Sequence, residues 1–175
     1  MNSFTAFFAA DIARYGKGES RYIKNFHYYF RKAQCCKNIF SFLYYRFIFR
    51  IICQKRGIEI SPKTQIGKGL YLGHAYNITI NPSVVIGENC NIHKGVTIGQ
   101  ENRGERKGAP KIRNAVWIGV NATFVGNITI GDDVLIAPNS FVNQDIPSHS
   151  IVFGNPCIIK TKKNATEHYI NNIVH

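Results

Sequence analysis

Hydrophobic residues recur at every sixth position over about half of this chain. Neither a helix nor a strand with two alternating faces has this period, whereas short strands that turn a corner and stack on the coil below do. Glycine directly follows the apolar residue in five of the repeats, where a corner often needs a positive φ angle. The pattern predicts a parallel β-helix from about residue 58 to about residue 143. The apolar series reads Ile60, Ile66, Leu72, then Ile80, Ile86, Ile92, Ile98, then Ile112, Ile118, Phe124, Ile130, Ile136 and Val142.

The repeat is interrupted in two places, and interruptions in a solenoid tend to carry function. The first is a two-residue slip between Leu72 and Ile80, which contains His74. The second is a polar insert at 99–111, rich in Arg, Glu and Gly. An insert of this length is expected to project from the β-helix and to reach a neighbouring molecule.

Residues 1–56 show helical spacing instead, and no proline occurs before Pro62. Aromatic residues are dense at 38–52, and two arginines there argue against a helix that spans a bilayer. The favoured interpretation is a helical cap that buries its aromatic face on the next domain or on a neighbouring subunit. The alternative is peripheral contact with a membrane surface. We therefore expect an α-helical segment at 1–56, a β-helix domain at 57–160 with a protruding loop at 99–111, and a tail at 161–175.

The net charge of +12 is concentrated near the N-terminus. Residues 1–56 hold 11 Lys and Arg against two acidic residues, so they carry +9. The predicted counterpart is an anionic membrane surface, a polyanionic substrate or water, and not nucleic acid. The five cysteines form no CxxC pair, which favours a reduced, cytoplasmic protein without a metal site. The apolar run at 4–10 is too short for a signal peptide. The predicted location is the cytoplasm, with the inner face of the cell membrane as the alternative if 1–56 contact lipid.

Residues 57–160 resemble the serine acetyltransferase family of hexapeptide acyltransferases. The resemblance implies a mainly β fold, a left-handed parallel β-helix with an N-terminal helical segment. It also implies acetyl-CoA as cosubstrate and a homotrimer with active sites between neighbouring subunits. The motifs that carry it are Ile58-Glu59-Ile60-Ser61-Pro62, Ile66-Gly67-Lys68-Gly69, Gly73-His74-Ala75, Val96-Thr97-Ile98-Gly99, Ala109-Pro110-Lys111-Ile112 and Gly154-Asn155-Pro156.

The same resemblance assigns the site residues. His74 matches the catalytic histidine, and imidazole has a pKa suited to a general base at neutral pH. Glu59 matches its acidic partner, which is usually Asp in the family and would orient the ring. The CoA groove is expected at Gly99, Gln100, Val120, Ala137 and Pro138. Lys160, together with Lys162 and Lys163, is expected either to meet the CoA phosphates or to form a solvated tail.

The chain departs from the serine-specific pattern around the acceptor. The acidic residue before the catalytic histidine is replaced by Gly73, and the Arg-His pair of the loop by Gly108 and Ala109. Gly73, Arg103 and Arg106 are the remaining candidates for acceptor binding, since either arginine could substitute from the loop.

Because the charged residues that would bind the two charged ends of serine are missing, the sequence favours an uncharged acceptor with a hydroxyl group. The pattern is also similar to colanic acid and other capsule O-acetyltransferases, so the predicted reaction is acetylation of a surface-polysaccharide sugar. L-serine O-acetylation in cysteine biosynthesis is the alternative. A weaker alternative is a β-helical zinc carbonic anhydrase, for which His74 and His93 lack an evident third histidine. A non-catalytic scaffold is the other weaker alternative.

Overall fold

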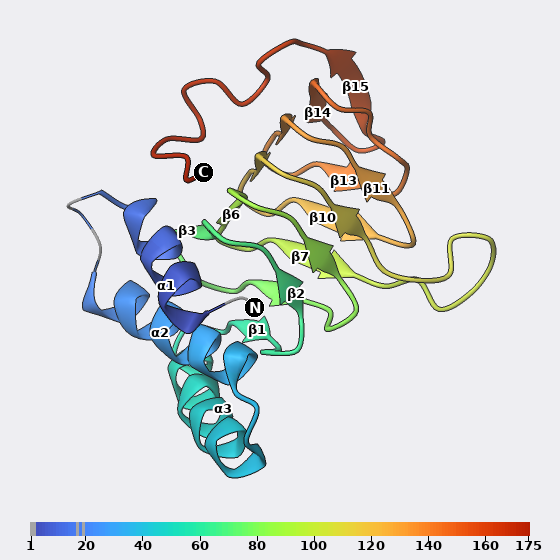
Figure 1. Cartoon of the computed structure of the whole chain (residues 1–175). Helices are drawn as coiled ribbons and strands as arrows, with labels where there is room; N and C mark the ends of the chain where they lie inside the picture. The colour runs from blue at the N-terminus through green and yellow to red at the C-terminus, as the bar shows by residue number, and fades with distance from the viewer. Residues whose placement is uncertain (1–2, 17, 19) are drawn as a thin grey trace.

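The computed structural model describes residues 3–16, 18 and 20–175. Three helices precede a column of short strands (Figure 1). They are α1 (Phe4–Ala13), α2 (Arg21–Cys35) and α3 (Ile39–Gln54). Each begins after a residue whose side-chain oxygen accepts a hydrogen bond from a backbone N–H of the first turn, namely Ser3, Ser20 and Asn38. The helical character expected of 1–56 is thus present in three separate helices.

The rest of the chain consists of fifteen short strands among the described residues. They are β1 (Glu59–Ile60), β2 (Gln65–Ile66), β3 (Tyr71–Gly73), β4 (Thr79–Ile80), β5 (Val85–Ile86), β6 (Asn91–His93), β7 (Thr97–Gly99), β8 (Lys111–Ile112), β9 (Val116–Ile118), β10 (Thr123–Val125), β11 (Thr129–Ile130), β12 (Val134–Ile136), β13 (Phe141–Val142), β14 (Ser150–Phe153) and β15 (Ile158–Thr161).

The strands form three sheets that enclose one hydrophobic core. Their orders are β1-β4-β7-β10-β13, β11-β8-β5-β2 and β15-β14-β12-β9-β6-β3, and below we call them sheets A, B and C. All pairings are parallel except that of β14 with β15. Ile60 is paired with Ile80, and Ile80 with Ile98, so the apolar repeat stacks from coil to coil with its side chains buried. The expected left-handed parallel β-helix is confirmed.

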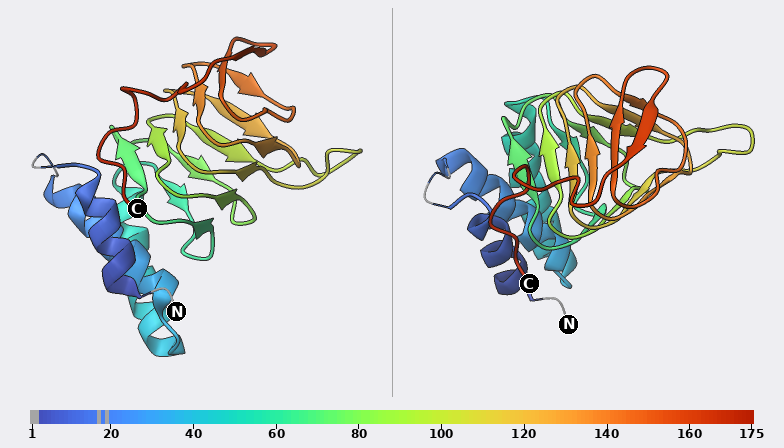
Figure 2. Two further views of the ribbon diagram at one scale, coloured as in Figure 1. Left: turned by 45° about the horizontal axis from the view of Figure 1, so that its top comes forward. Right: turned by 90° about the horizontal axis from the view of Figure 1, so that it is seen from above.

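Both interruptions of the repeat lie at corners of the β-helix. The slip forms the turn between β3 in sheet C and β4 in sheet A. The insert leaves the end of β7 and projects far from the coils (Figures 1 and 2). Its base is held by backbone hydrogen bonds between Glu101 and Gly108 of 2.9 and 3.0 Å.

Helices α1 and α2 close the first coil through a buried ionic cluster. The Asp11 carboxylate accepts hydrogen bonds from Arg31 Nε at 2.7 Å and from the backbone N–H of Leu70 at 2.9 Å. Arg31 also donates to the carbonyls of Ile66 and Gly67. Burial alone would raise the pKa of Asp11, but nearby His27 and Arg31 outweigh it and hold that pKa below its usual value. The cluster ties both helices to the β-helix.

The aromatic residues of 38–52 are mostly not buried by this arrangement. Helix α3 inserts Phe49 and Cys53 into the core. Phe40 is 79% exposed and Phe47 62% exposed. Most aromatic side chains of α3 are therefore not buried on the β-helix of the same chain. The expected helical cap that buries its aromatic face on the next domain is thus not found within one chain. No helix in the described part of the chain combines the length and apolar character needed to cross a membrane.

The C-terminal residues 161–175 return along the outer face of sheet C towards α1 (Figure 2). Asp133 Oδ1 accepts from the backbone N–H of Thr166 at 2.9 Å and from its hydroxyl at 2.7 Å. Further down, Asn91 Nδ2 donates to the carbonyl of Tyr169 at 3.2 Å. The predicted tail is thus a strap that covers part of sheet C.

Candidate functional site

His74 follows β3 and lies on the corner between sheets C and A, where it is exposed. Its φ angle is 50°, a left-handed conformation that is uncommon outside glycine and asparagine. Asn121 and Asn139, which follow β9 and β12, have the same conformation at 58° and 59°. The residue of this coil that stacks with Asn121 and Asn139, through Gly95, is Asn77, whose φ angle is 51°. His74 is therefore an additional left-handed residue, introduced by the slip, and it presents an exposed imidazole on this corner.

Three of the residues expected to bind CoA share this edge with His74. Gly73 is paired with His93. When the register of β6, β9 and β12 is continued by one residue, Gly119 and Ala137 stack above this pair. Val120 and Pro138 directly follow these two residues, so they lie on the same corner of the β-helix as His74. The structure thus brings His74, Val120, Ala137 and Pro138 to one edge of the β-helix.

The other expected CoA contacts lie elsewhere on the same chain. Gly99 is the last residue of β7, and Gln100 follows it. They lie at the corner where the strands of sheet A end, whereas His74 lies at the corner where these strands begin. Lys160 is exposed on β15, and its Nζ lies 5.5 Å from the centre of the Phe153 ring. A single chain therefore does not assemble all the predicted CoA contacts around His74.

The predicted partners of His74 are also apart from it within one chain. Glu59 is exposed on β1, and among the described residues its carboxylate forms no ion pair or hydrogen bond with His74. Arg103 and Arg106 are exposed in the projecting loop, which leaves a different corner of the β-helix. Their predicted roles require a neighbouring copy of the chain or a rearranged side chain.

Gly73 is buried because the ring of His93 fills the space beside it. A Cβ atom on Gly73 would lie 2.6 Å from His93 Nε2 and closer still to Cδ2. His93 Nδ1 donates a hydrogen bond of 2.9 Å to the carbonyl of Ile118, which leaves Nε2 as the unprotonated nitrogen of the neutral ring. Burial lowers the pKa of His93 and outweighs the hydrogen bond to Ile118, which alone would raise it. A neutral histidine thus occupies the place where an acidic side chain would lie.

A cavity of about 280 Å3 opens next to His93, between sheet C and the C-terminal strap. The Trp117 ring packs against His93 with centroids 4.6 Å apart and against Tyr169 of the strap at 5.1 Å. The lining residues are Arg14, Tyr15, Tyr71, Asn91, His93, Trp117, Tyr169, Asn171 and Asn172.

Except for His93, sequence reasoning singled out none of these lining residues for a site. Tyr71, Asn91 and Trp117 are outward positions of successive coils in one register, so reading the polar face of the repeat could have found them. The strap residues gave no such signal, because nothing in the tail sequence indicates that it folds back.

Arg14 ties this cavity to the N-terminal helices. Its guanidinium donates to the carbonyl of Asn171 at 2.9 Å, to the carbonyl of Gly69 at 2.7 Å and to Asn91 Oδ1 at 2.6 Å. The cavity therefore has a basic wall whose position is fixed by three separate elements. No group of three His, Cys, Asp or Glu side chains that could hold a metal ion is found within residues 3–16, 18 and 20–175.

Comparison with known proteins shows what this chain is similar to. The sequence model described as "Bacterial transferase hexapeptide (six repeats)" matches residues 109–144. The chain is 40% identical over 100 residues to Serine acetyltransferase 2 of Arabidopsis thaliana, which covers 57% of this chain and 31% of that protein. It is 41% identical over 100 residues to a serine acetyltransferase of Staphylococcus aureus, covering 57% of this chain and 47% of that protein. The chain thus spans less than half the length of the curated relatives it matches.

Solved structures agree in fold. Soybean serine acetyltransferase matches with a TM-score of 0.76 at 25% identity, over 90% of this chain and 69% of that one. The serine acetyltransferase of Brucella abortus in complex with coenzyme A matches with a TM-score of 0.75 at 27% identity, over 91% and 68%. By sequence and by fold, therefore, this chain is similar to hexapeptide-repeat transferases, and the solved structures it resembles are serine acetyltransferases.

Proposed function

We propose that this chain is an O-acetyltransferase that moves an acetyl group from acetyl-CoA to a hydroxyl, with His74 as general base. The observation that carries the proposal is the exposed imidazole of His74 on the same edge as Val120, Ala137 and Pro138. Its support from relatives is that the similar proteins are serine acetyltransferases, one of them solved with coenzyme A.

In the proposed reaction, His74 takes the proton of the acceptor hydroxyl as its oxygen attacks the thioester carbonyl. The tetrahedral intermediate then collapses and the C–S bond breaks. His74 returns the proton to the departing sulfur, so the products are the acetyl ester and free CoA. Neutral His93 assists this cycle by adding no positive charge beside the imidazolium that forms on His74. Glu59 remains the proposed acidic partner.

The site is proposed to lie between copies of a homotrimer. Within one chain, the projecting loop and the residues Gly99 and Gln100 lie at a different corner from His74. An arrangement in which one copy presents His74 and its neighbour presents the loop would bring these two corners together. Residues 99–111 project from the coils (Figure 2), and a loop of this length can extend to a neighbouring copy.

L-serine is the first candidate acceptor. The sequence alone favoured a sugar, but the matched relatives are named serine acetyltransferases, and this supports L-serine better. One solved relative, from Neisseria gonorrhoeae, is in complex with serine and matches with a TM-score of 0.69 at 26% identity.

A sugar hydroxyl is the second candidate, and the structure contributes a specific observation in its favour. The space beside Gly73 is filled by a neutral histidine, and the loop carries Ala109 where an ionic clamp for an amino acid was expected. The adjacent cavity is lined by Trp117 and Tyr169, and the guanidinium of Arg14 in its wall already donates to three oxygen atoms of the protein. Aromatic rings with a few fixed polar groups are typical of pockets for uncharged organic ligands.

An assay of CoA thiol release decides between these acceptors. The full-length protein is given acetyl-CoA with L-serine, or with a panel of nucleotide sugars and oligosaccharides. His74→Ala is expected to lower the rate by roughly 10²–10⁴-fold, the usual contribution of a general base. His175→Ala, which removes another exposed histidine, is the matched control and should keep the wild-type rate. Full activity in His74→Ala would show that the base is a different residue.

A further inference from the structure

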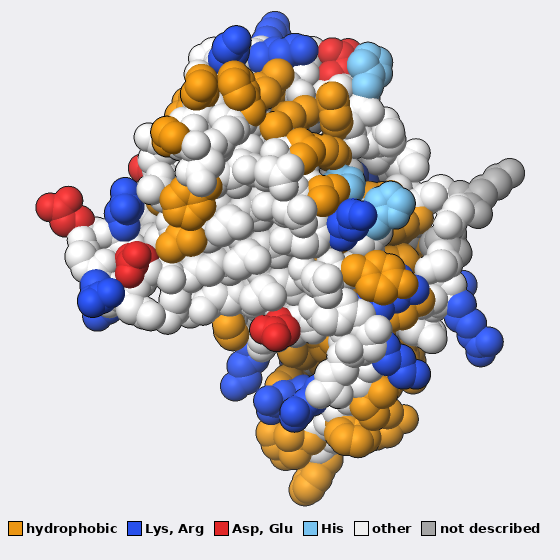
Figure 3. Space-filling view, turned by 180° about the vertical axis from the view of Figure 1, so that it is seen from behind, with side chains coloured by type: hydrophobic (Ala, Val, Ile, Leu, Met, Phe, Trp, Pro, Cys, Tyr) orange, Lys and Arg blue, Asp and Glu red, His pale blue; other side chains and the backbone are white. Residues whose placement is uncertain are grey.

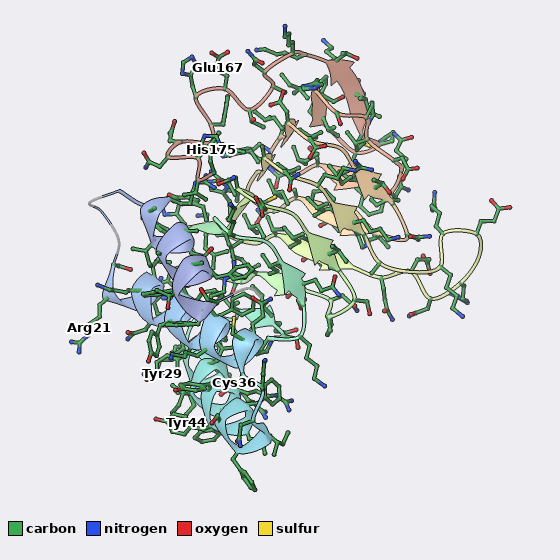
Figure 4. All side chains as sticks on the ribbon, in the orientation of Figure 1. Arg21, Tyr29, Cys36, Tyr44, Glu167 and His175 are labelled. Atoms are coloured by element: carbon green, nitrogen blue, oxygen red, sulfur yellow. The ribbon has the colours of Figure 1, made fainter. Side chains whose placement is uncertain are left out.

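Helix α3 presents an exposed apolar face that none of the described residues covers. The row Phe40, Tyr44, Phe47 and Ile51 follows steps of four, three and four residues, so these side chains share one side of the helix. They are 79%, 58%, 62% and 39% exposed. Leu43, which is 50% exposed, widens the same face. In Figure 4 Tyr44 points away from the β-helix, and Figure 3 shows hydrophobic side chains gathered at this end of the molecule.

Basic side chains border this face on both sides. At about 100° per residue, Arg46 and Arg50 lie along one edge and Lys55 along the other. All three are exposed and have no ion pair among the described residues. No Asp or Glu occurs between Glu19 and Glu59 in the sequence, whereas nine Lys and Arg do. The charge around the apolar face is therefore of one sign.

We propose that this face of α3 docks on an anionic lipid surface, with the helix lying in the plane of the membrane interface. Aromatic and aliphatic side chains would enter the boundary between headgroups and acyl chains. The long stems of Arg46, Arg50 and Lys55 would let their charges reach the lipid phosphates from the rim of the face. Attraction of this kind contributes for every basic residue near the surface. The inference does not depend on which hydroxyl the enzyme acetylates.

Charge also argues against a second copy as the occupant. Two such faces in contact would bring Arg46, Arg50 and Lys55 of one copy towards those of the other, and like charges that are desolvated together are costly. A lipid surface of opposite charge carries no such penalty. Charge therefore favours a lipid surface over a second copy of this same face.

The test is cosedimentation of the full-length protein with vesicles. One set is made of phosphatidylcholine alone, and the other of phosphatidylcholine and phosphatidylglycerol in equal amounts. Wild-type protein is expected to bind the mixed vesicles and to be released progressively by salt, because the rim charges are screened. Arg46→Glu/Arg50→Glu should lower the partition coefficient by roughly tenfold or more. Phe40→Ser/Phe47→Ser should lower it to a similar degree.

Ile158→Ser is the matched control, because Ile158 is 54% exposed but lies on β15, far from α3. It should bind vesicles as the wild type does. Circular dichroism confirms that each variant is folded, and light scattering reports its oligomeric state. Equal binding to both kinds of vesicle, or unchanged binding by Phe40→Ser/Phe47→Ser, would overturn the proposal. A smaller oligomer in the Phe40→Ser/Phe47→Ser variant would also overturn it, since α3 would then join copies of the chain.

Discussion

Replacing Gly73 by Ala tests how the corner that carries His74 is packed. The added Cβ would lie 2.6 Å from Nε2 of His93, which is closer than such atoms approach in real structures. The His93 ring must therefore move. It is held in place by the 2.9 Å hydrogen bond to the carbonyl of Ile118 and by its contact with Trp117. Both interactions are weakened when the ring swings away.

The expected cost follows from these two contacts. A hydrogen bond of this kind contributes about 0.5–1.5 kcal/mol. An aromatic pair contributes about 0.5–1.5 kcal/mol beyond its buried area. Together they give a loss of about 1–3 kcal/mol in the free energy of unfolding, which is also the usual cost of an overpacked core. For a chain of this size, that loss lowers the melting temperature by roughly 2–12 °C.

Thermal unfolding at one fixed protein concentration measures the effect, because assembly of copies also stabilises the fold. Gly99→Ala is the control: its Cβ would meet only the carbonyl oxygen of Phe124 at 3.8 Å, an ordinary contact. A cycle with His93→Ala isolates the cause, since Gly73→Ala should cost little once the ring is gone. A melting temperature equal to that of the wild type, or an equal loss with and without His93, would refute this reasoning.

Three further predictions concern buried or partly buried groups. Asp11→Asn leaves buried Arg31 without its counter-charge and should cost about 3–5 kcal/mol in chemical unfolding, part of which Asp11→Asn/Arg31→Met should restore. The pKa of Asp133 is lowered because hydrogen bonds from Thr166 outweigh partial burial. The ionised carboxylate therefore stabilises the fold fully above the ordinary carboxyl pKa, and this stabilisation is lost as the pH falls through the lowered value. The amide of Thr166 should then exchange its hydrogen faster relative to neighbouring amides below about pH 4, and unchanged protection there would contradict this. Burial raises the pKa of Cys90 to about 12, so alkylation at pH 8, followed by mass spectrometry, should modify it only on unfolding.

The repeat in the sequence was sufficient for the scaffold. Buried side chains one coil apart must stack, so a period of six with glycines at corners permits few other folds, and residues such as Ile80 and Ile98 lie where it predicts. The slip and the insert were also located in the sequence, because a change of period is a local property of the chain, and the structure places both at corners. Left-handedness came from resemblance, since periodicity does not depend on hand.

Only the tertiary structure decided what surrounds His74. The His93 ring occupies the space beside Gly73 because the two residues are neighbours across coils, a pairing set by register. The strap that brings Tyr169 to Trp117 depends on single hydrogen bonds such as those of Asp133, which leave no pattern in the sequence. Likewise, the helical spacing of α3 predicted an apolar face, but not that Phe47 would stay exposed, because exposure depends on which elements α3 packs against. The sequence by itself thus determined the coil, through repeated local contacts, and the fold decided the site, through contacts between distant residues.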